Sequence, residues 1–236
     1  MKENSKYPRR SQMRERLPIT IKQIKQLLEA AQEHPLKALL TVALTTGMRR
    51  GELLGLCWQD VDFQNEILHV RRIVAASGER KATETMRTIA LPEIAVHVLK
   101  EHQQNQEKEK EECGEGWHDL HLVFSNEVGQ HLNLGKLWQQ YHAFFVDAGL
   151  SQMRFHDLRN CTIVFFVTMG VNPKVIQVIL GLRWQSTSVQ TLTPISHSMQ
   201  KEAMKTWDAL SSDLPIKSHA HTIRQILLHQ SEAEEE

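Results

Sequence analysis

One stretch of β-type pattern interrupts a chain whose apolar residues otherwise recur at helical spacing. Residues 67–74 and 87–91 form short β-like runs, which predicts an antiparallel hairpin. Only a brief glycine-containing turn at residues 75–78 precedes the second half of this segment, so the hairpin is expected to be abbreviated. One more short strand is expected at residues 122–124. Many helices beside one small antiparallel sheet predict an α+β, mostly helical fold.

The helical segments carry their own start and end signals. Thr20 with Gln23 three residues later has a capping-box pattern, and Asn172 followed by Pro173 supplies an N-cap and a first-turn proline. Gly47 can take the left-handed conformation that ends a helix and turns the chain. We expect helices at residues 20–33, at 36–44, from 49, from 92, and at 134–148, 156–169, 174–180 and 199–210.

The chain is expected to form one folded domain with charged ends. A hydrophobic content of 41% in 236 residues is enough for one substantial core, and no internal repeat divides residues 19–212. Residues 1–18 are a basic leader and residues 213–236 an acidic tail, both expected to be solvated and disordered. Residues 103–112 are charged and lack an apolar stripe, so a solvated helix end or a loop is expected there.

Several function classes are disfavoured by composition. No run of about 18 apolar residues exists and no apolar segment follows the basic leader, so we expect neither a membrane span nor a signal peptide, and a cytoplasmic location. The three cysteines match no metal-ligand or CxxC spacing, and no acid or cysteine partners converge with the histidines; we expect no disulfide and no metal. The net charge of +0 gives no general signal for nucleic acid.

Two motifs go further than composition. Residues 46–62, which begin Thr-Gly-Met-Arg-Arg-Gly-Glu, resemble the first conserved box of the tyrosine recombinase (phage integrase) family. By this resemblance Arg49 binds the scissile phosphate and Glu52 supports the helix that follows. Residues 154–159, Arg-Phe-His-Asp-Leu-Arg, are similar to the second box of that family. At helical spacing His156 and Arg159 share a face, so both can point at one oxyanion.

A third stretch supplies the remaining candidate. Residues 81–89 are similar to the β-hairpin segment that carries the family's lysine general acid, which assigns that role to Lys81. The resemblance implies phosphoryl transfer without a metal or any other cofactor: two guanidiniums grip the phosphate, a tyrosine attacks phosphorus, and the lysine protonates the 5′-hydroxyl that leaves. It also implies the family's catalytic-domain fold and covers nearly all of residues 17–210.

The chain departs from the family pattern in its third region. Counting forward from Gly181 and backward from Met199 gives the same register, and it puts Leu182 at the family's histidine and Leu192 at its tyrosine. Leucine has no nucleophilic or ionisable group. The chain contains only two tyrosines: Tyr141 belongs to an apolar helix stripe, and Tyr7 lies in the leader, where nothing positions it for attack.

We therefore predict a protein of the site-specific recombinase or integrase family. It is expected to bind a phosphate of double-stranded DNA through Arg49, Lys81, His156 and Arg159. It is also expected to be deficient in cleavage, so its status as an enzyme is left open. Only about 18 residues precede the first helix, where the family places a core-binding domain, and binding is expected to be weak and salt-sensitive. Two alternatives remain: a non-enzymatic DNA-binding or dimerisation partner of an intact recombinase, as a homo- or hetero-oligomer, or a decaying remnant.

Overall fold

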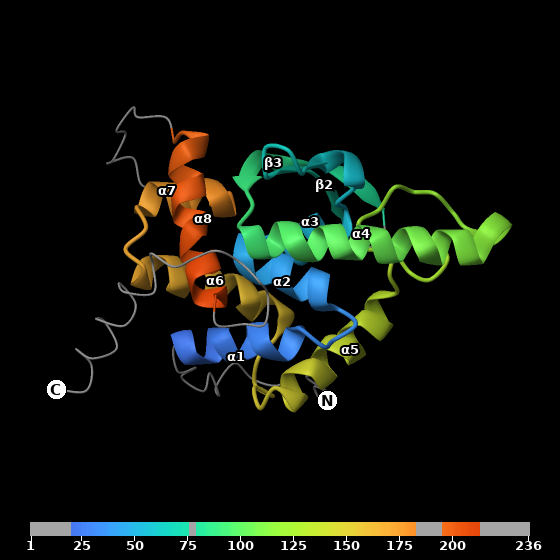
Figure 1. The fold of residues 1–236 in the computed structure, drawn as a ribbon, viewed down its shortest axis with the longest axis horizontal. Coiled ribbons are helices and arrows are strands. Elements are labelled where there is room, and N and C mark those ends of the chain that lie inside the picture. Colours follow the sequence, from blue (N-terminus) through green and yellow to red (C-terminus); the bar gives the residue numbers. More distant parts are fainter. Residues whose placement is uncertain (1–19, 76–78, 183–194, 213–236) are drawn as a thin grey trace, which may run out of the picture.

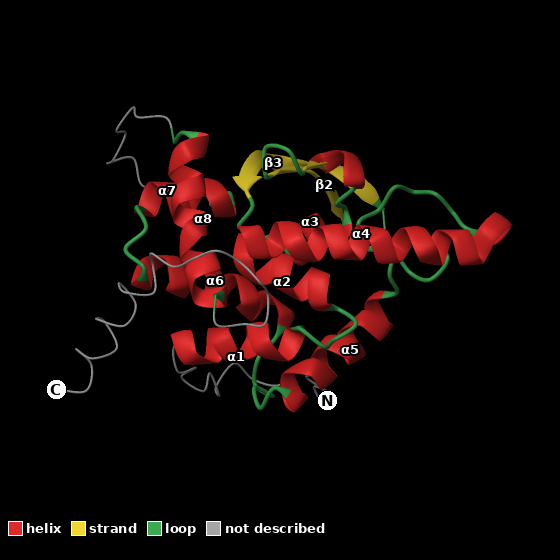
Figure 2. Ribbon diagram, viewed as in Figure 1, coloured by secondary structure: helices red, strands yellow, loops and turns green. Residues whose placement is uncertain are grey.

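Helices make up most of the molecule, and the strands lie together on one side of it (Figures 1 and 2). The computed structural model describes residues 20–75, 79–182 and 195–212, so the predicted leader and tail lie outside the described residues. Each predicted helical segment is helical. The helices are α1 (Ile21–Ala31), α2 (Lys37–Thr46), α3 (Arg50–Leu54), α4 (Glu93–Cys113), α5 (Leu134–Asp147), α6 (Phe155–Thr168), α7 (Pro173–Leu180) and α8 (His197–Ser211), with 3-10 turns at Trp58–Asp60 and Gly114–Gly116.

The predicted cap signals act as expected. The Thr20 hydroxyl accepts a hydrogen bond from the Gln23 backbone amide, and the Gln23 side-chain oxygen accepts one from the Thr20 backbone amide. The helix α1 therefore begins with a capping box. The Asn172 side chain accepts from Lys174 N at 2.9 Å at the start of α7. Gly47 ends α2 with φ +62°. These local signals set where the helices begin and turn.

The sheet has three antiparallel strands in the order β1 (Val61–Asp62), β2 (Ile67–Val74) and β3 (Arg80–Ala90). The register runs from Ile67 opposite Ala90 to Val70 opposite Arg87, and resumes with Arg72 opposite Ala82. Between these two paired runs, β2 has only residue 71, whereas β3 has residues 83–86. The extra residues of β3 form a bulge between Ala82 and Arg87. The expectation of an abbreviated hairpin was wrong, because β3 pairs as far as Arg80.

Residues 122–124 do not form the expected strand: among the described residues, this segment makes one isolated bridge, between Cys57 and Leu122. The three apolar residues are buried beneath α4 instead of paired in a sheet. The Gln106 amide on α4 donates to the carbonyls of Leu122 and Val123, at 3.2 and 3.3 Å, and thus replaces a strand neighbour. The charged segment 103–112 was expected to be a solvated helix end or a loop. It is the C-terminal half of α4, and within it Gln106 is buried.

The core gathers around α2, which is buried along nearly its whole length and contacts α1, α4 and α6. The last helix, α8, packs against α4, α7 and β3, and its Trp207 ring lies 3.9 Å from that of Phe165 on α6. Among the described residues no helix has both the length and the apolar character needed to cross a membrane. The arrangement brings the end of α2, the start of α3 and the end of α7 together.

Glycines allow these three elements to approach closely. A Cβ on Gly47 would lie 2.3 Å from Leu180 Cδ2, at the end of α7. A Cβ on Gly51 would lie 2.8 Å from the carbonyl oxygen of Val74, at the end of β2. Because both separations are too short for a real contact, the turn from α2 into α3 can lie between α7 and the hairpin only with glycine at these positions.

Candidate functional site

Arg49 lies at the N-cap of α3 and is held there by Glu52. One Glu52 carboxylate oxygen accepts from the Arg49 backbone amide at 2.8 Å and the other from Arg49 Nη1 at 3.0 Å. The Glu52 side chain is 1% exposed, whereas that of Arg49 is 44% exposed. The buried acid therefore orients an arginine that still reaches the surface, which agrees with the supporting role predicted for Glu52.

Arg87 on β3 is a second, buried partner of Glu52. Its Nη1 and Nη2 each lie 2.9 Å from one of the two carboxylate oxygens, and its side chain is 6% exposed. Burial raises the pKa of Glu52, but the hydrogen bonds and charges of Arg87 and then Arg49 outweigh it and hold that pKa below its ordinary value. Glu52 is therefore ionised at neutral pH and binds both guanidiniums.

Sequence reasoning did not single out Arg87. It lies within the quoted segment 81–89, but a basic residue in a short amphipathic strand is ordinarily read as facing solvent. The only sequence signal is its place directly before the buried end of the strand, at Ile89 and Ala90. Its partner Glu52 is 35 positions away, which no local pattern reveals.

Arg159 on α6 is buried and is bonded to carbonyl oxygens. Its Nη1 donates to the Gly47 carbonyl and its Nη2 to the Leu180 carbonyl, the latter at 2.7 Å. Burial, and then the charges of Arg49 and Arg87, lower the pKa of Arg159 to about 10. It is therefore still protonated at neutral pH. Within the described ranges no carboxylate forms an ion pair with it, so its charge is not directly neutralised there.

Three arginines meet at the last turn of α7. We call Arg49, Arg87 and Arg159 the arginine cluster. They donate to successive carbonyls of residues 179–181: Arg87 Nε to the first at 2.7 Å, Arg159 to the second, and Arg49 Nη2 to the third at 3.4 Å. The final carbonyls of a helix lack intrahelical partners and carry partial negative charge, so they suit guanidinium donors. The structure thus brings together the two arginines that the sequence predicted, with a third between them.

Lys81 is not part of this cluster. Its side chain is 59% exposed, and its Nζ lies 3.1 Å from a carboxylate oxygen of Glu79. It pairs across the hairpin with Ile73, whose backbone lies against Gly55 at the end of α3. The hairpin contributes Arg87 to the cluster and also reaches it through Thr85, whose hydroxyl lies 3.5 Å from Arg49 Nη1. Lys81 is therefore on the same hairpin but is separated from the arginines by the bulge.

Of the other positions that the sequence singled out, His156, Leu182 and Tyr141 are among the described residues. His156 is exposed on the first turn of α6, one helical turn before Arg159. Leu182 is half-buried against the core just after α7, where its amide donates to the Gln177 carbonyl at 3.1 Å. Leu192 lies outside the described residues. Tyr141 is buried, with its ring 5.4 Å from that of Phe155.

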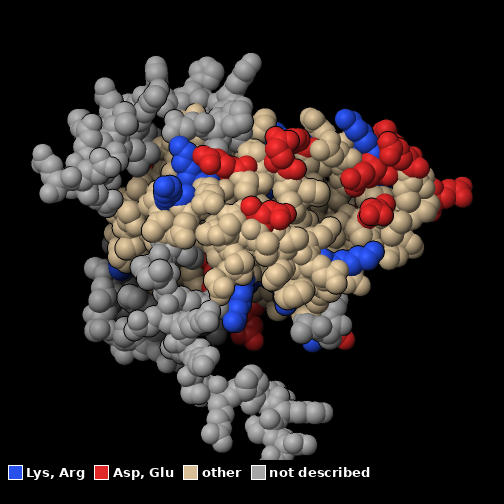
Figure 3. Space-filling model, turned by 90° about the horizontal axis from the view of Figure 1, so that it is seen from below, with Lys and Arg blue, Asp and Glu red and all other residues tan. Residues whose placement is uncertain are grey.

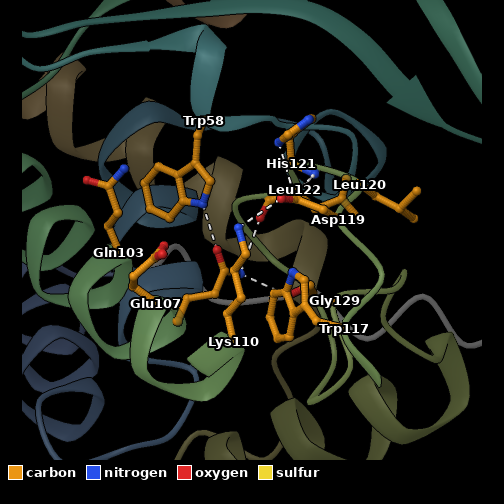
Figure 4. Close-up of a pocket in the computed structure, with 12 residues that line it drawn as sticks. Trp58, Gln103, Glu107, Lys110, Trp117, Asp119, Leu120, His121, Leu122 and Gly129 are labelled. Atoms are coloured by element: carbon orange, nitrogen blue, oxygen red, sulfur yellow. Dashed lines mark hydrogen bonds and ion pairs between the residues drawn. The ribbon is translucent and has the colours of Figure 1, made fainter. Parts of the chain in front are cut away.

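A pocket between α4 and the loop at residues 117–129 lies away from this cluster (Figure 4). Trp58, Trp117 and Gln106 contribute to its wall, and none of the predicted site residues lines it. Acidic side chains gather at this end of the molecule (Figure 3), and the far half of α4 bears exposed Glu107 and Glu109. Among the described residues no cluster of histidine, cysteine, aspartate and glutamate could hold a metal. This end of the molecule is thus chemically unlike the arginine cluster.

Comparison with known proteins matches most of the chain. The family described as the phage integrase family matches residues 18–193. A "tyrosine recombinase XerC-like" protein of Caldanaerobacter subterraneus subsp. tengcongensis is 31% identical over 206 residues, which are 80% of this chain and 53% of that protein. An integrase of Streptomyces ambofaciens is 32% identical over 139 residues, 55% of this chain and 36% of that protein. The chain spans about half the length, or less, of these curated relatives.

Solved structures share the fold. The crystal structure of the XerA recombinase superposes with a TM-score of 0.58 at 23% identity, over 81% of this chain and 65% of that one. The Tn1549 transposon integrase, solved in complex with a circular intermediate DNA, gives a TM-score of 0.58 at 17% identity, over 81% of this chain and 66% of that one. At these identities the likeness establishes the α+β, mostly helical architecture.

Proposed function

Since this chain belongs to the phage integrase family, we propose that it binds a phosphate of double-stranded DNA through Arg49 and Arg159 and does not cleave DNA by itself. Lys81 and His156 complete the proposed phosphate site from the hairpin and from the first turn of α6. The proposed ligand is DNA. We also propose a cytoplasmic location for the protein. The proposal concerns this chain alone, which covers part of the length of its relatives.

The observation that carries the proposal is the charge balance of the arginine cluster. The cluster holds three guanidiniums and one carboxylate, Glu52, which pairs with Arg49 and Arg87. Among the described residues, the acceptors of the buried Arg159 are the Gly47 and Leu180 carbonyls, and no carboxylate bonds to it. A buried charge is costly unless an opposite charge compensates it. An anion beside Arg159 and the half-exposed Arg49 supplies that compensation, and a phosphodiester matches the fork geometry of a guanidinium.

The proposed lack of cleavage rests on the absence of a nucleophile. The family's tyrosine position falls on Leu192 and its histidine position on Leu182. Tyr141 is buried, and its ring packs beside those of Phe145 and Phe155, so we do not assign the nucleophile's role to it. An enzyme that retains phosphate donors but has no nucleophile can bind the substrate without forming a covalent intermediate.

Breaking the ion pair between Lys81 and Glu79 costs little free energy. Its ion pair with Glu79 is between two exposed side chains, 59% and 66% accessible. Exposed pairs of this kind contribute little stability, because water and salt screen them. We propose that the lysine exchanges Glu79 for a DNA phosphate oxygen. His156 is exposed on the first turn of α6.

Binding to duplex DNA tests the proposal. We expect Arg49→Ala to weaken binding of a fluorescein-labelled duplex about tenfold and to reduce the slope of log affinity against log salt by about one. Arg71→Ala is the matched control, because Arg71 is 49% exposed and pairs with a buried carboxylate, Asp60, that keeps Arg72 as a second partner. Fluorescence anisotropy over a salt series measures both quantities. Equal losses in the two variants would contradict phosphate binding at Arg49.

A further inference from the structure

Arg87 is bonded to three different parts of the cluster's surroundings. Its two terminal nitrogens bind both oxygens of Glu52, its Nε binds the Ile179 carbonyl, and Nη1 also lies 3.3 Å from the Thr85 carbonyl. Its side chain is 6% exposed. Since each of its three nitrogens already bonds a protein acceptor and its charge is paired with a carboxylate, Arg87 is not placed to bind the DNA itself.

The bonds of Arg87 lead to both proposed phosphate-binding arginines. On one side, Glu52 connects it to the backbone and guanidinium of Arg49. On the other side, the Ile179 carbonyl connects it to the last turn of α7, where the next carbonyl, of Leu180, binds Arg159. One side chain therefore joins the start of α3 to the end of α7, and through them the two guanidiniums.

Close packing supports the same connection. The last turn of α7 rests on the Arg87 side chain, since a Cβ on Gly181 would lie 3.1 Å from both its Cδ and its Nη1. The left-handed conformation of Gly181, φ +62°, turns the chain over this contact. Movement of Arg87 would consequently move the Leu180 and Gly181 carbonyls to which Arg159 and Arg49 are bonded.

We propose that Arg87 is a positioning residue that sets the separation of the Arg49 and Arg159 guanidiniums so that both bind one phosphate. This inference rests on the proposed function of the cluster. Arginine is required because a planar fork can bind two carboxylate oxygens while its Nε serves a third acceptor. A lysine at this position keeps the charge beside Glu52 but has a single nitrogen, and cannot hold Glu52 and α7 in fixed relation.

The experiment compares Arg87→Lys with Arg72→Lys in anisotropy titrations of the full chain with the same labelled duplex. Arg72 is the matched control, because its side chain is 26% exposed and lies 2.7 Å from the buried carboxylate of Asp60. We expect Arg87→Lys to weaken binding about tenfold and Arg72→Lys less than about twofold, after both are shown to be folded by circular dichroism. Equal affinities of Arg87→Lys and the wild type would overturn the proposal.

A double-mutant cycle separates positioning from a general loss of stability. If Arg87 acts through Arg49, adding Arg87→Lys to Arg49→Ala costs little further affinity, whereas independent effects multiply. Multiplying losses would overturn the proposal. If wild type and Arg49→Ala bind equally weakly, the proposed phosphate site fails instead, so the two failures are distinguishable.

A second variant covers the case in which Arg87→Lys does not fold. Replacing both members of a buried ion pair by apolar residues is far less disruptive than removing one. The double variant Glu52→Met with Arg87→Met leaves Arg49 in the chain but without its support. We expect it to bind the duplex as weakly as Arg49→Ala, and wild-type affinity in this variant would overturn the proposal.

Discussion

At the scale of single residues, the site depends on how close two helices can come. Gly47 is left-handed, and its carbonyl accepts from Arg159. The same residue leaves space for Leu180 and for the Thr162 hydroxyl, whose oxygen a Cβ would meet at 3.2 Å. One glycine thus serves the backbone turn, the packing of α7 and the position of an arginine.

Gly47→Ala is expected to lower the free energy of unfolding by about 2–5 kcal/mol, through left-handed strain of about 1–2 kcal/mol and overpacking of about 1–3 kcal/mol. Gly170→Ala is the matched control, since Gly170 has φ +69° but a Cβ there would meet no atom within 4 Å. It should show the backbone strain alone. Urea denaturation measures both. Equal losses would show that contact with Leu180 is unimportant.

At the scale of elements, α4 depends on another helix for its start. Its N-cap is Pro92, which offers no side-chain hydrogen bond. The buried carboxylate of Asp208 on α8 accepts from the Ile94 amide at 3.1 Å instead. Burial raises the pKa of Asp208 to about 6, opposed by bonds from the backbone amides of Ile94 and Glu93 and assisted by the negative charges of Glu93 and Glu66.

This raised pKa predicts a pH-dependent stability. Because the folded state favours the protonated acid, the contribution of Asp208 is fully present below about pH 4 and is lost as the pH rises through about 6. The shift corresponds to at most about 3 kcal/mol. Asp208→Asn stays neutral and keeps an oxygen for Ile94, so its unfolding free energy should fall less between pH 4.5 and 7 than that of the wild type. Parallel profiles in urea titrations would contradict this assignment.

At the scale of the whole molecule, the fold has the architecture of solved tyrosine recombinases, and the arginine cluster lies within it. The sequence register predicts Leu192 and Leu182 at the family's tyrosine and histidine positions. The described tyrosine, Tyr141, is in the core. The long far half of α4 and its pocket lie elsewhere and share no residue with the cluster. We therefore expect this chain to bind DNA without cleaving it.

Nicked suicide DNA substrates provide a direct measurement. We expect no covalent protein–DNA adduct on denaturing gels, because the one tyrosine among the described residues, Tyr141, is buried in the core. An intact recombinase of the same family, with its own site, is the positive control for trapping. An adduct formed by this chain would contradict the proposed deficiency, and loss of that adduct in Tyr7→Phe or Tyr141→Phe would identify the nucleophile.

The sequence alone determined the features that depend on near neighbours. Thr20 with Gln23, Asn172 with Pro173, and Gly47 set helix boundaries through bonds and dihedral angles that span a few residues. The two motif boxes identified the family, which the match over residues 18–193 confirms. Residues 122–124 were mistaken for a strand because an apolar run signals burial without revealing what its backbone pairs with.

Only the tertiary structure decided how the charges are paired. The bond of Arg87 to Glu52, the three arginines on the end of α7, and the capping of α4 by Asp208 join residues far apart in the chain. A charged side chain in a short strand looks the same in sequence whether it faces water or a buried carboxylate. Its burial depends on which elements pack over it, and that is a property of the assembled core.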